Sequence, residues 1–208
     1  PPRLRVGELS DDLILDGHLD DAAWAKADAI LGLTMVEPDE GVAASMGTEI
    51  RVLANSTTLV IGILCRDPNP AAIVSRSVAR DSGQNGEDHV RVVLGPFRDG
   101  RSGYVFAVNP SGARYDGLIS SNGERTDSSW DGIWEAKTAR NGDGWSVEMR
   151  IPIRTLRFGA ELEAWDFNVE RWIERLQERD RWTGAARDRK VTQTLHAGLL
   201  VGLPRFDL

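Results

Sequence analysis

Cysteine is almost absent from the sequence, and its scarcity excludes two kinds of small protein. The only cysteine is Cys65, so no disulfide can form within the chain and a disulfide-stapled scaffold is excluded. A zinc site built on several thiolates is excluded for the same reason. The three histidines, His18, His89 and His196, are isolated from one another in the sequence. The cysteine count leaves the cellular compartment open.

Long apolar runs are missing as well. The longest extends from Leu59 to Cys65, far short of the roughly 20 apolar residues that a membrane helix needs. The chain begins at Pro1 without the charged and apolar segments of a signal peptide, so we expect a mature form or an excised piece. The run 199–203 ends at Pro204, which favours a boundary before a longer segment.

Catalytic motifs and excess basic charge are also lacking. The sequence has no Gly-x-Ser-x-Gly elbow, no His-Glu-x-x-His, no phosphate-binding loop and no Gly-x-Gly-x-x-Gly after a strand. Lys and Arg number 25 against 32 Asp and Glu, which gives a formal net charge of −7 that would repel a nucleic acid. We therefore expect a non-catalytic protein that does not bind nucleic acid.

Turn-forming residues and tryptophan are abundant by contrast. The 208 residues include 21 Gly, 9 Pro and 7 Trp, against only 2 Tyr and 5 Phe. A chain of this length suits one domain, and we assign residues 1–208 to it. Seven indoles exceed what one core of this size normally needs, so we expect some of them to face outward.

Alternating and apolar runs separated by turn residues predict an all-β fold, an antiparallel β-sandwich with one or two short helices. The predicted strands are 13–15, 48–54, 59–65, 90–94, 104–108, 113–120, 134–140, 145–151, 165–173 and 199–203. The predicted helices are 19–27 and 71–77. The charged run 174–181 is interpreted as a solvated loop.

Three tryptophans are predicted to belong to the core, because small or apolar residues surround them. They are Trp24, Trp145 and Trp165. The other four have polar neighbours: Trp130, Trp134, Trp172 and Trp182. On one extended strand, Trp130 and Trp134 would lie about 13 Å apart, too far to hold one sugar between them.

Trp172 is the strongest candidate for an exposed aromatic platform. In a strand over 165–173, it shares one face with three hydrogen-bonding side chains at a spacing of two residues. These are Asp166, Asn168 and Glu170. A flat ring beside carboxylate and amide groups is the arrangement that a saccharide needs. In the alternative interpretation, the segment 175–181 covers Trp172, and Trp182 anchors that segment.

Five motifs in series give the sequence a family resemblance over nearly its whole length. They lie at 15–24, 65–70, 98–112, 130–135 and 144–152. In this order they resemble family 9 carbohydrate-binding modules, in the version found N-terminal to a bacterial outer-membrane β-barrel. The resemblance implies a β-sandwich, saccharide binding and export to the periplasm, the outer membrane or the cell exterior. Haem-binding subunits of periplasmic dehydrogenases share this architecture.

Some family 9 modules carry structural calcium, so the resemblance makes acidic side chains in loops candidate calcium ligands. The candidate oxygen donors are Asp67, Glu87, Asp88 and Asp116. No twelve-residue calcium loop is present. In the alternative interpretation, these acids cap turns or pair with Arg66, Arg80 and Arg114.

Two functions are thus compatible with the sequence. The first is a monomeric, non-catalytic module that binds a saccharide through Trp platforms and polar groups on one sheet face. The second is a structural or partner-binding domain, N-terminal to a membrane barrel, that binds no sugar. The positions of the four tryptophans with polar neighbours distinguish the two.

Overall fold

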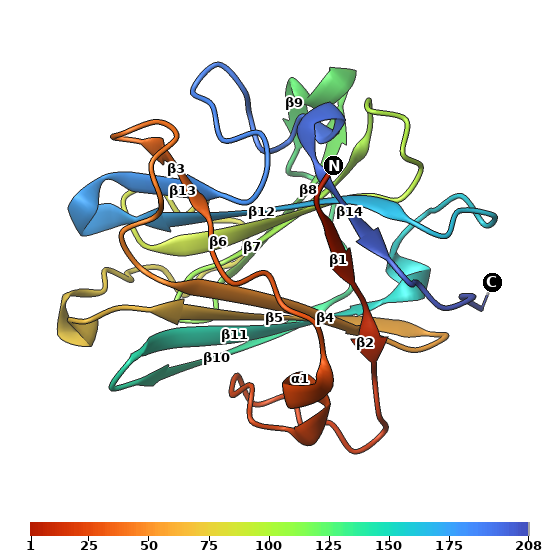
Figure 1. Ribbon diagram of the computed structural model, residues 1–208, viewed down its shortest axis with the longest axis horizontal. Coiled ribbons are helices and arrows are strands. Elements are labelled where there is room, and N and C mark those ends of the chain that lie inside the picture. Colours follow the sequence, from red (N-terminus) through yellow and green to blue (C-terminus); the bar gives the residue numbers. More distant parts are fainter. Residues whose placement is uncertain (208) are drawn as a thin grey trace.

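Two β-sheets pack face to face in the computed structural model, which describes residues 1–207 (Figure 1). The larger sheet has the order β1-β14-β12-β6-β7-β8-β9, with β13 added to β12 and β3 added to β13. The smaller sheet has the order β10-β11-β5-β4-β2. The predicted β-sandwich is confirmed.

The strands are β1 (Arg3–Arg5), β2 (Gly7–Glu8), β3 (Thr34–Glu37), β4 (Thr48–Ala54), β5 (Thr58–Arg66), β6 (His89–Gly95), β7 (Gly103–Val108), β8 (Arg114–Ser120), β9 (Arg125–Asp127), β10 (Glu135–Asn141), β11 (Gly144–Pro152), β12 (Trp165–Ile173), β13 (Glu178–Arg181) and β14 (Gly198–Val201). The α-helix is α1 (Ala22–Lys26), and the 3₁₀ turns are η1 (Pro70–Ala72), η2 (Ser121–Gly123), η3 (Ile153–Thr155), η4 (Glu174–Leu176) and η5 (Thr194–His196). Among the described residues, no helix is long and apolar enough to cross a bilayer.

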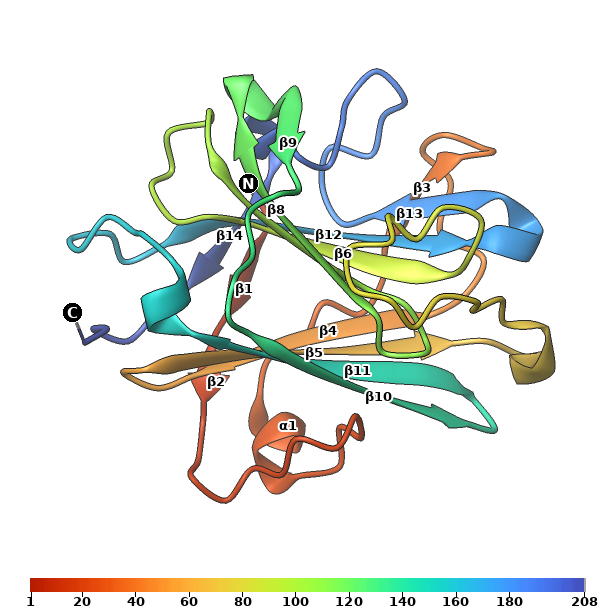
Figure 2. The ribbon, with the colours of Figure 1, turned by 180° about the vertical axis from the view of Figure 1, so that it is seen from behind.

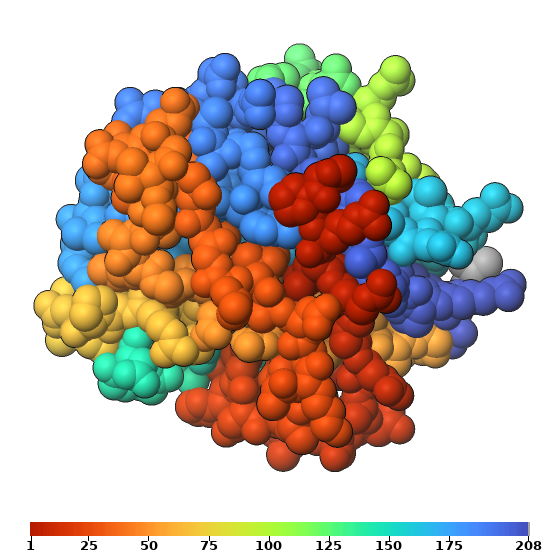
Figure 3. All heavy atoms as spheres, viewed as in Figure 1, coloured from red at the N-terminus to blue at the C-terminus, as the bar shows by residue number. Residues whose placement is uncertain are grey.

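Short turns join the antiparallel pairs β4–β5, β7–β8 and β10–β11, as their turn residues predict. The N-terminal segment connects the two sheets. Its first strand, β1, pairs in parallel with β14 at the edge of the larger sheet, and β2 pairs in parallel with β4 at the edge of the smaller one. Figure 3 shows this segment in red against the C-terminal part of the chain in blue.

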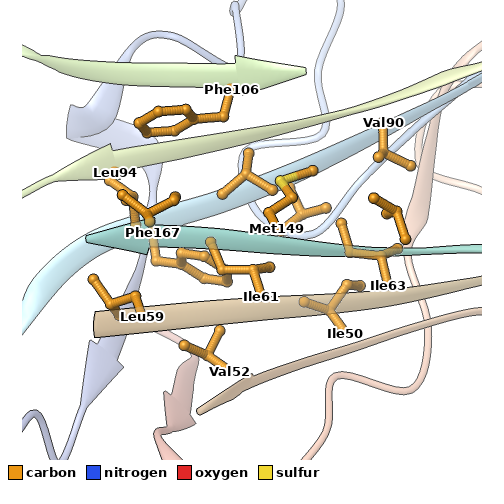
Figure 4. Packing of buried hydrophobic residues seen from close by; sticks show 14 of the residues in the cluster. Ile50, Val52, Leu59, Ile61, Ile63, Val90, Leu94, Phe106, Met149 and Phe167 are labelled. Atoms are coloured by element: carbon orange, nitrogen blue, oxygen red, sulfur yellow. The ribbon is translucent and has the colours of Figure 1, made fainter. Parts of the chain in front are cut away.

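Apolar side chains fill the space between the sheets (Figure 4). They come from alternate positions of the central strands, because successive side chains of a strand point to opposite faces. Trp145 and Trp165 belong to this core, as predicted, with exposed fractions of 0% and 1%. Trp24 is 1% exposed but belongs to a separate cluster with Leu53 and Val60, on the outer face of the smaller sheet.

Helix α1 lies below the smaller sheet in both ribbon views (Figures 1 and 2). Its Trp24 ring approaches the sheet so closely that a Cβ atom on Gly62 would lie 2.7 Å from the ring. Real Cβ contacts are not this short, so the approach of helix and strand requires glycine at this position of β5.

Several local predictions are wrong. Residues 13–15 form no strand, and the helix predicted at 71–77 is only the 3₁₀ turn η1. The run 174–181 is not a solvated loop, because it contains β13, in which Glu178, Asp180 and Arg181 are buried. The short strands β1, β2, β3 and β9 were missed, since distant segments rather than local pattern stabilise them.

A buried carboxylate fastens the N-terminal loop to the smaller sheet. Glu148, on β11, has an exposed fraction of 0%. Its Oε1 accepts hydrogen bonds from the backbone N–H groups of Asp16 at 2.9 Å and Gly17 at 2.8 Å. Its Oε2 accepts one from Trp24 Nε1 at 3.0 Å. Burial raises the pKa of Glu148, and these hydrogen bonds oppose the rise.

We predict that Glu148→Gln lowers the free energy of unfolding by about 2 kcal/mol, because an amide NH₂ would face N–H donors that now meet a carboxylate oxygen. Urea denaturation at neutral pH measures the effect. Glu135→Gln is the matched control, since Glu135 is 60% exposed and lies 3.7 Å from Arg150, which makes it a weak surface pair. Equal stability of the two variants would contradict the anchoring role of Glu148.

Candidate functional site

A polar hollow of about 310 Å³ lies on the outer face of the larger sheet, turned away from the smaller sheet. A second hollow, of about 330 Å³, adjoins it, since Arg91 and Arg179 are in the walls of both. We call the two together the outer hollow. The loop that follows β13 rises above this face in both ribbon views (Figures 1 and 2).

The pairing register of β6, β12 and β13 brings together the side chains that form the floor of the outer hollow. On β12, Glu170 and Trp172 alternate with core residues, so they point outward. Arg91 of β6 lies opposite Glu170 on one side, and Arg181 of β13 lies opposite it on the other. Arg179 of β13 lies opposite Trp172 in the same way.

Glu170 holds two arginines of β13 in place. Its carboxylate accepts hydrogen bonds from Arg179 Nη1 at 2.6 Å and from Arg181 Nε at 2.8 Å. Arg181 Nη1 donates in turn to the carbonyl oxygen of Gly184 at 2.8 Å. Glu170 is 3% exposed and both of its oxygens are occupied, so it positions the arginines and offers little to a ligand.

Trp172 is the one predicted platform that the structure places in the outer hollow. Its ring is half-buried, and its Nε1 donates to Glu174 Oε2 at 2.6 Å. The guanidinium carbon of Arg179 lies 4.9 Å from the ring centroid, so this arginine stacks on the ring. The segment 175–181 therefore contacts Trp172 without burying it.

His89, next to Trp172, is a neutral group at physiological pH. Burial, together with the positive charge of Arg91, lowers its pKa to about 4. Its Nδ1 lies 3.0 Å from the carbonyl oxygen of Glu87. Asn85 and Gln177, in the same wall, offer amide groups beside the indole.

The other three tryptophans with polar neighbours pack inward. Trp134 is 2% exposed and lies 5.0 Å from the ring of Phe106, so its interpretation as an outward-facing residue is wrong. Trp130 is half-buried at 5.1 Å from the ring of Tyr104. Trp182 packs edge-on against Phe167 at 6.0 Å. None of the three lines the outer hollow.

The predicted wet face around Trp172 is also partly wrong. Asn168 is 1% exposed, because its Nδ2 donates to the carbonyl oxygen of Thr183 at 3.0 Å and the loop after β13 covers it. Asp166 lies away from the outer hollow, 3.7 Å from Arg98 Nε. Burial raises the pKa of Asp166 to about 6.

The sequence interpretation missed the arginines of the outer hollow, although a signal for them was present. In the run Glu178-Arg179-Asp180-Arg181, acids and arginines alternate strictly. A spacing of two residues indicates a strand with opposite charges on its two faces. Arg91 alternates with valines in the same way on β6.

The four acids considered as calcium ligands serve separate partners. Asp67 makes two hydrogen bonds with Arg175, at 2.7 and 2.6 Å. Glu87 accepts a hydrogen bond from Asn109 Nδ2, Asp88 accepts one from the backbone N–H of Glu174, and Asp116 accepts one from Trp134 Nε1.

Asp116 does lie near two other acids, Asp81 and Asp131. Arg80 already occupies this cluster, with distances of 2.8 Å to Asp116, 3.8 Å to Asp131 and 3.8 Å to Asp81. A guanidinium in that position repels a second cation, so the cluster does not fit a calcium ion.

A larger hollow, of about 560 Å³, lies beside α1 and β2. The described residues that line it are small or charged, such as Ala23, Asp21 and Lys26, and none is aromatic. It offers no ring on which a sugar could stack, so the outer hollow is the better candidate site.

We predict that a chelator leaves the melting temperature unchanged, because each of the four acids already accepts a hydrogen bond from a separate donor of the protein. Differential scanning calorimetry with EDTA and then with added calcium tests this. A calcium-dependent rise of several degrees would contradict it, since a ligand bound only to the folded state adds stability.

Asp180, on the inner face of β13, should make stability depend on pH. Burial, followed by the hydrogen bond and charge of Glu178, raises its pKa to about 8. The pKa of Asp in an unfolded chain is about 3.9, so the folded state holds a proton that the unfolded state loses. The resulting stabilisation is full below about pH 4 and is lost as the pH rises to about 8.

Asp180→Asn should remove this dependence. We predict that the stability of the variant relative to the parent rises between about pH 5 and pH 8, then levels off. Urea denaturation of both proteins across this range measures the difference. A difference that does not change with pH would show that Asp180 titrates normally.

Comparisons with known proteins identify the fold. No protein-family model and no curated protein matches the chain. A candidate carbohydrate-binding protein from Bacteroides uniformis is similar in structure, with a TM-score of 0.76 and 13% identity over 96% of this chain and 98% of that one.

Family 9 carbohydrate-binding modules from Caldicellulosiruptor kristjanssonii are also similar. The module in complex with cellotriose has a TM-score of 0.70 and 15% identity over 96% of this chain and 93% of that one. The module in complex with glucose has a TM-score of 0.68 and 14% identity over 96% and 95%. The sandwich described above is therefore a fold like that of family 9 carbohydrate-binding modules.

Proposed function

We propose that this protein is a non-catalytic saccharide-binding module and that the sugar lies in the outer hollow, against Trp172. The observation that carries the proposal is the position of this indole, half-exposed in a polar hollow of the larger sheet. The fold supports it, because the structures from Caldicellulosiruptor kristjanssonii hold cellotriose and glucose in modules of this architecture.

The chemistry of the wall suits a sugar. An indole ring packs against the C–H face of a pyranose, while amides and charged groups around it hydrogen-bond the hydroxyls. Asn85 supplies an amide and Gln177 supplies an amide oxygen, whereas the carboxylate of Glu174 already accepts hydrogen bonds from Trp172 Nε1 and Gln177 Nε2. Because Arg179 already stacks on the ring, one aromatic surface remains for the ligand, and we expect modest affinity.

The cellular setting is a proposal that depends on the five sequence motifs alone. We propose an exported module of a bacterial envelope protein, attached to an outer-membrane barrel, that acts as a monomer without a cofactor. The competing function is a structural or partner-binding domain in the same position that binds no sugar.

We predict that Trp172→Ala lowers the affinity for any saccharide the protein binds by about 1 to 3 kcal/mol, by analogy with bases stacked on aromatic side chains. The fold should remain, since the ring lies outside the main core. A screen of the parent protein on a glycan array identifies the sugar, and isothermal titration calorimetry then compares the variants.

Trp130→Ala is the control for loss of an indole. It removes contacts with Tyr104 and Phe106 on the inner side of the larger sheet, so it should lower stability and leave affinity unchanged. A parent protein that binds no glycan, together with a strongly destabilised Trp172→Ala, would overturn saccharide binding and favour the partner-binding domain.

A further inference from the structure

We propose that the outer hollow selects an anionic saccharide, one that carries a carboxylate or a sulfate ester, and that Arg91 and Arg189 bind the anionic group. This inference rests on the proposed saccharide-binding function and specifies its ligand class. The supporting observations are the positive charge of the hollow and the arginines that no carboxylate within residues 1–207 neutralises.

Positive charge is concentrated in the part of the outer hollow that has a volume of about 310 Å³. Six cationic side chains line it: Arg91, Arg179, Arg181, Arg187, Arg189 and Lys190. Three acids accompany them: Glu37, Glu124 and Glu170. The lining therefore has a formal excess of three positive charges, on a chain whose formal net charge is −7. Such a local field in an acidic protein attracts anions to this one surface.

Each of these three acids already pairs with a cationic side chain of the hollow. Glu170 is paired with Arg179 and Arg181, as described above. Glu124 pairs with Lys190 at 2.8 Å, and Glu37 lies 3.7 Å from Arg179 Nε. Within residues 1–207, the remaining arginines of the lining have no carboxylate within ion-pair distance. They are Arg91, Arg187 and Arg189.

Arg91 is the central member of this group, because it lies in the walls of both parts of the outer hollow. It is half-buried, and its guanidinium lies 5.6 Å from the ring centroid of Tyr115. Its Nε is screened from solvent and has no hydrogen-bond partner among the described residues. A guanidinium with free donors in a sheltered position favours an anion over water.

Arg187 and Arg189 come from the loop above the sheet, on the opposite wall. The guanidinium of Arg187 donates to the carbonyl oxygens of Val36 and Pro38, which fastens this loop to β3. Arg189 is exposed, and its side chain has no hydrogen bond within the described part of the chain. A ligand in the hollow would thus meet Arg91 from the sheet and Arg189 from the loop.

Guanidinium groups and an anionic sugar are chemically complementary. The planar fork of Arg binds a carboxylate or a sulfate through two parallel N–H···O hydrogen bonds. A neutral sugar would satisfy these donors with hydroxyl groups but would leave the excess positive charge uncompensated. Trp172, beside Arg91 in the adjoining part of the hollow, provides the surface for the ring of the same ligand.

Matched pairs of glycans test the charge preference directly. An array of neutral and acidic oligosaccharides is screened first, and calorimetry then compares each bound acid with its neutral partner. Trigalacturonate is paired with its methyl ester, and a sulfated galactose disaccharide with its desulfated form. We expect at least one acid to bind about tenfold more tightly than its neutral partner, with affinity falling as salt is added. Which pair shows the difference decides between carboxylate and sulfate.

Arg189→Gln and Arg91→Gln test the residues. Each should weaken the acidic ligand about tenfold and leave the neutral partner nearly unchanged, whereas Trp172→Ala should weaken both. Arg150→Gln is the control, because Arg150 lies on β11 of the other sheet and should affect neither. Arg189 is exposed, so its variant decides the matter even where Arg91→Gln fails to fold.

Three negative results would have different consequences for the anionic preference, the assigned arginines and the proposed function. If the neutral partners bind as tightly as the acids and Trp172→Ala abolishes both, the anionic preference is overturned and saccharide binding stands. If an acid binds but Arg189→Gln has no effect, the assignment to these arginines is overturned. If no glycan on the array binds, the preference and the proposed function are overturned together.

Discussion

Buried carboxylates fasten the loops of this protein to its sheets, and the rest of the structure depends on them. Glu148 holds the N-terminal loop and Trp24, and Asp116 holds Trp134 and the backbone N–H of Gly132, at 2.7 and 3.2 Å. A charge removed from water is tolerated only where several donors surround it. Each acid is therefore stable only when a loop covers it in the one conformation that supplies these donors. The same hydrogen bonds fix the position of the loop.

Glu170 also fixes the groups around it through hydrogen bonds to its carboxylate. It lies on the outer face of the larger sheet, and its partners are two arginine side chains instead of backbone N–H groups. Because its two oxygens are used by Arg179 and Arg181, Arg91 on the neighbouring strand receives no carboxylate. The interaction that orders the floor of the outer hollow thus also leaves an unpaired cation in it.

Sequence reasoning predicted the elements of the sandwich better than the candidate site. Alternation and turn residues are local signals, and they predicted the central strands and the core positions of Trp145 and Trp165. The surroundings of Trp134 are not local, since Asp116, the buried partner of its indole, comes from β8. Polar neighbours in the sequence therefore suggested exposure for a ring that is buried. For Trp172 the relevant neighbours lie on its own strand face, and the structure places its ring partly exposed on that face, as the pattern predicts.

The basic character of the outer hollow follows from the geometry of β13. Side chains of a strand alternate between faces, so Glu178 and Asp180 point inward while Arg179 and Arg181 point outward. The inward acids are accommodated because Ser45 donates to Glu178 at 2.6 Å and buried Arg171 lies opposite Asp180. A run with no net charge in the sequence is thus divided in the fold into two arginines on the outer face and two buried acids on the inner face. The positive field on one face is thus possible only because the interior accepts the acids, by hydrogen bonding one and raising the pKa of the other.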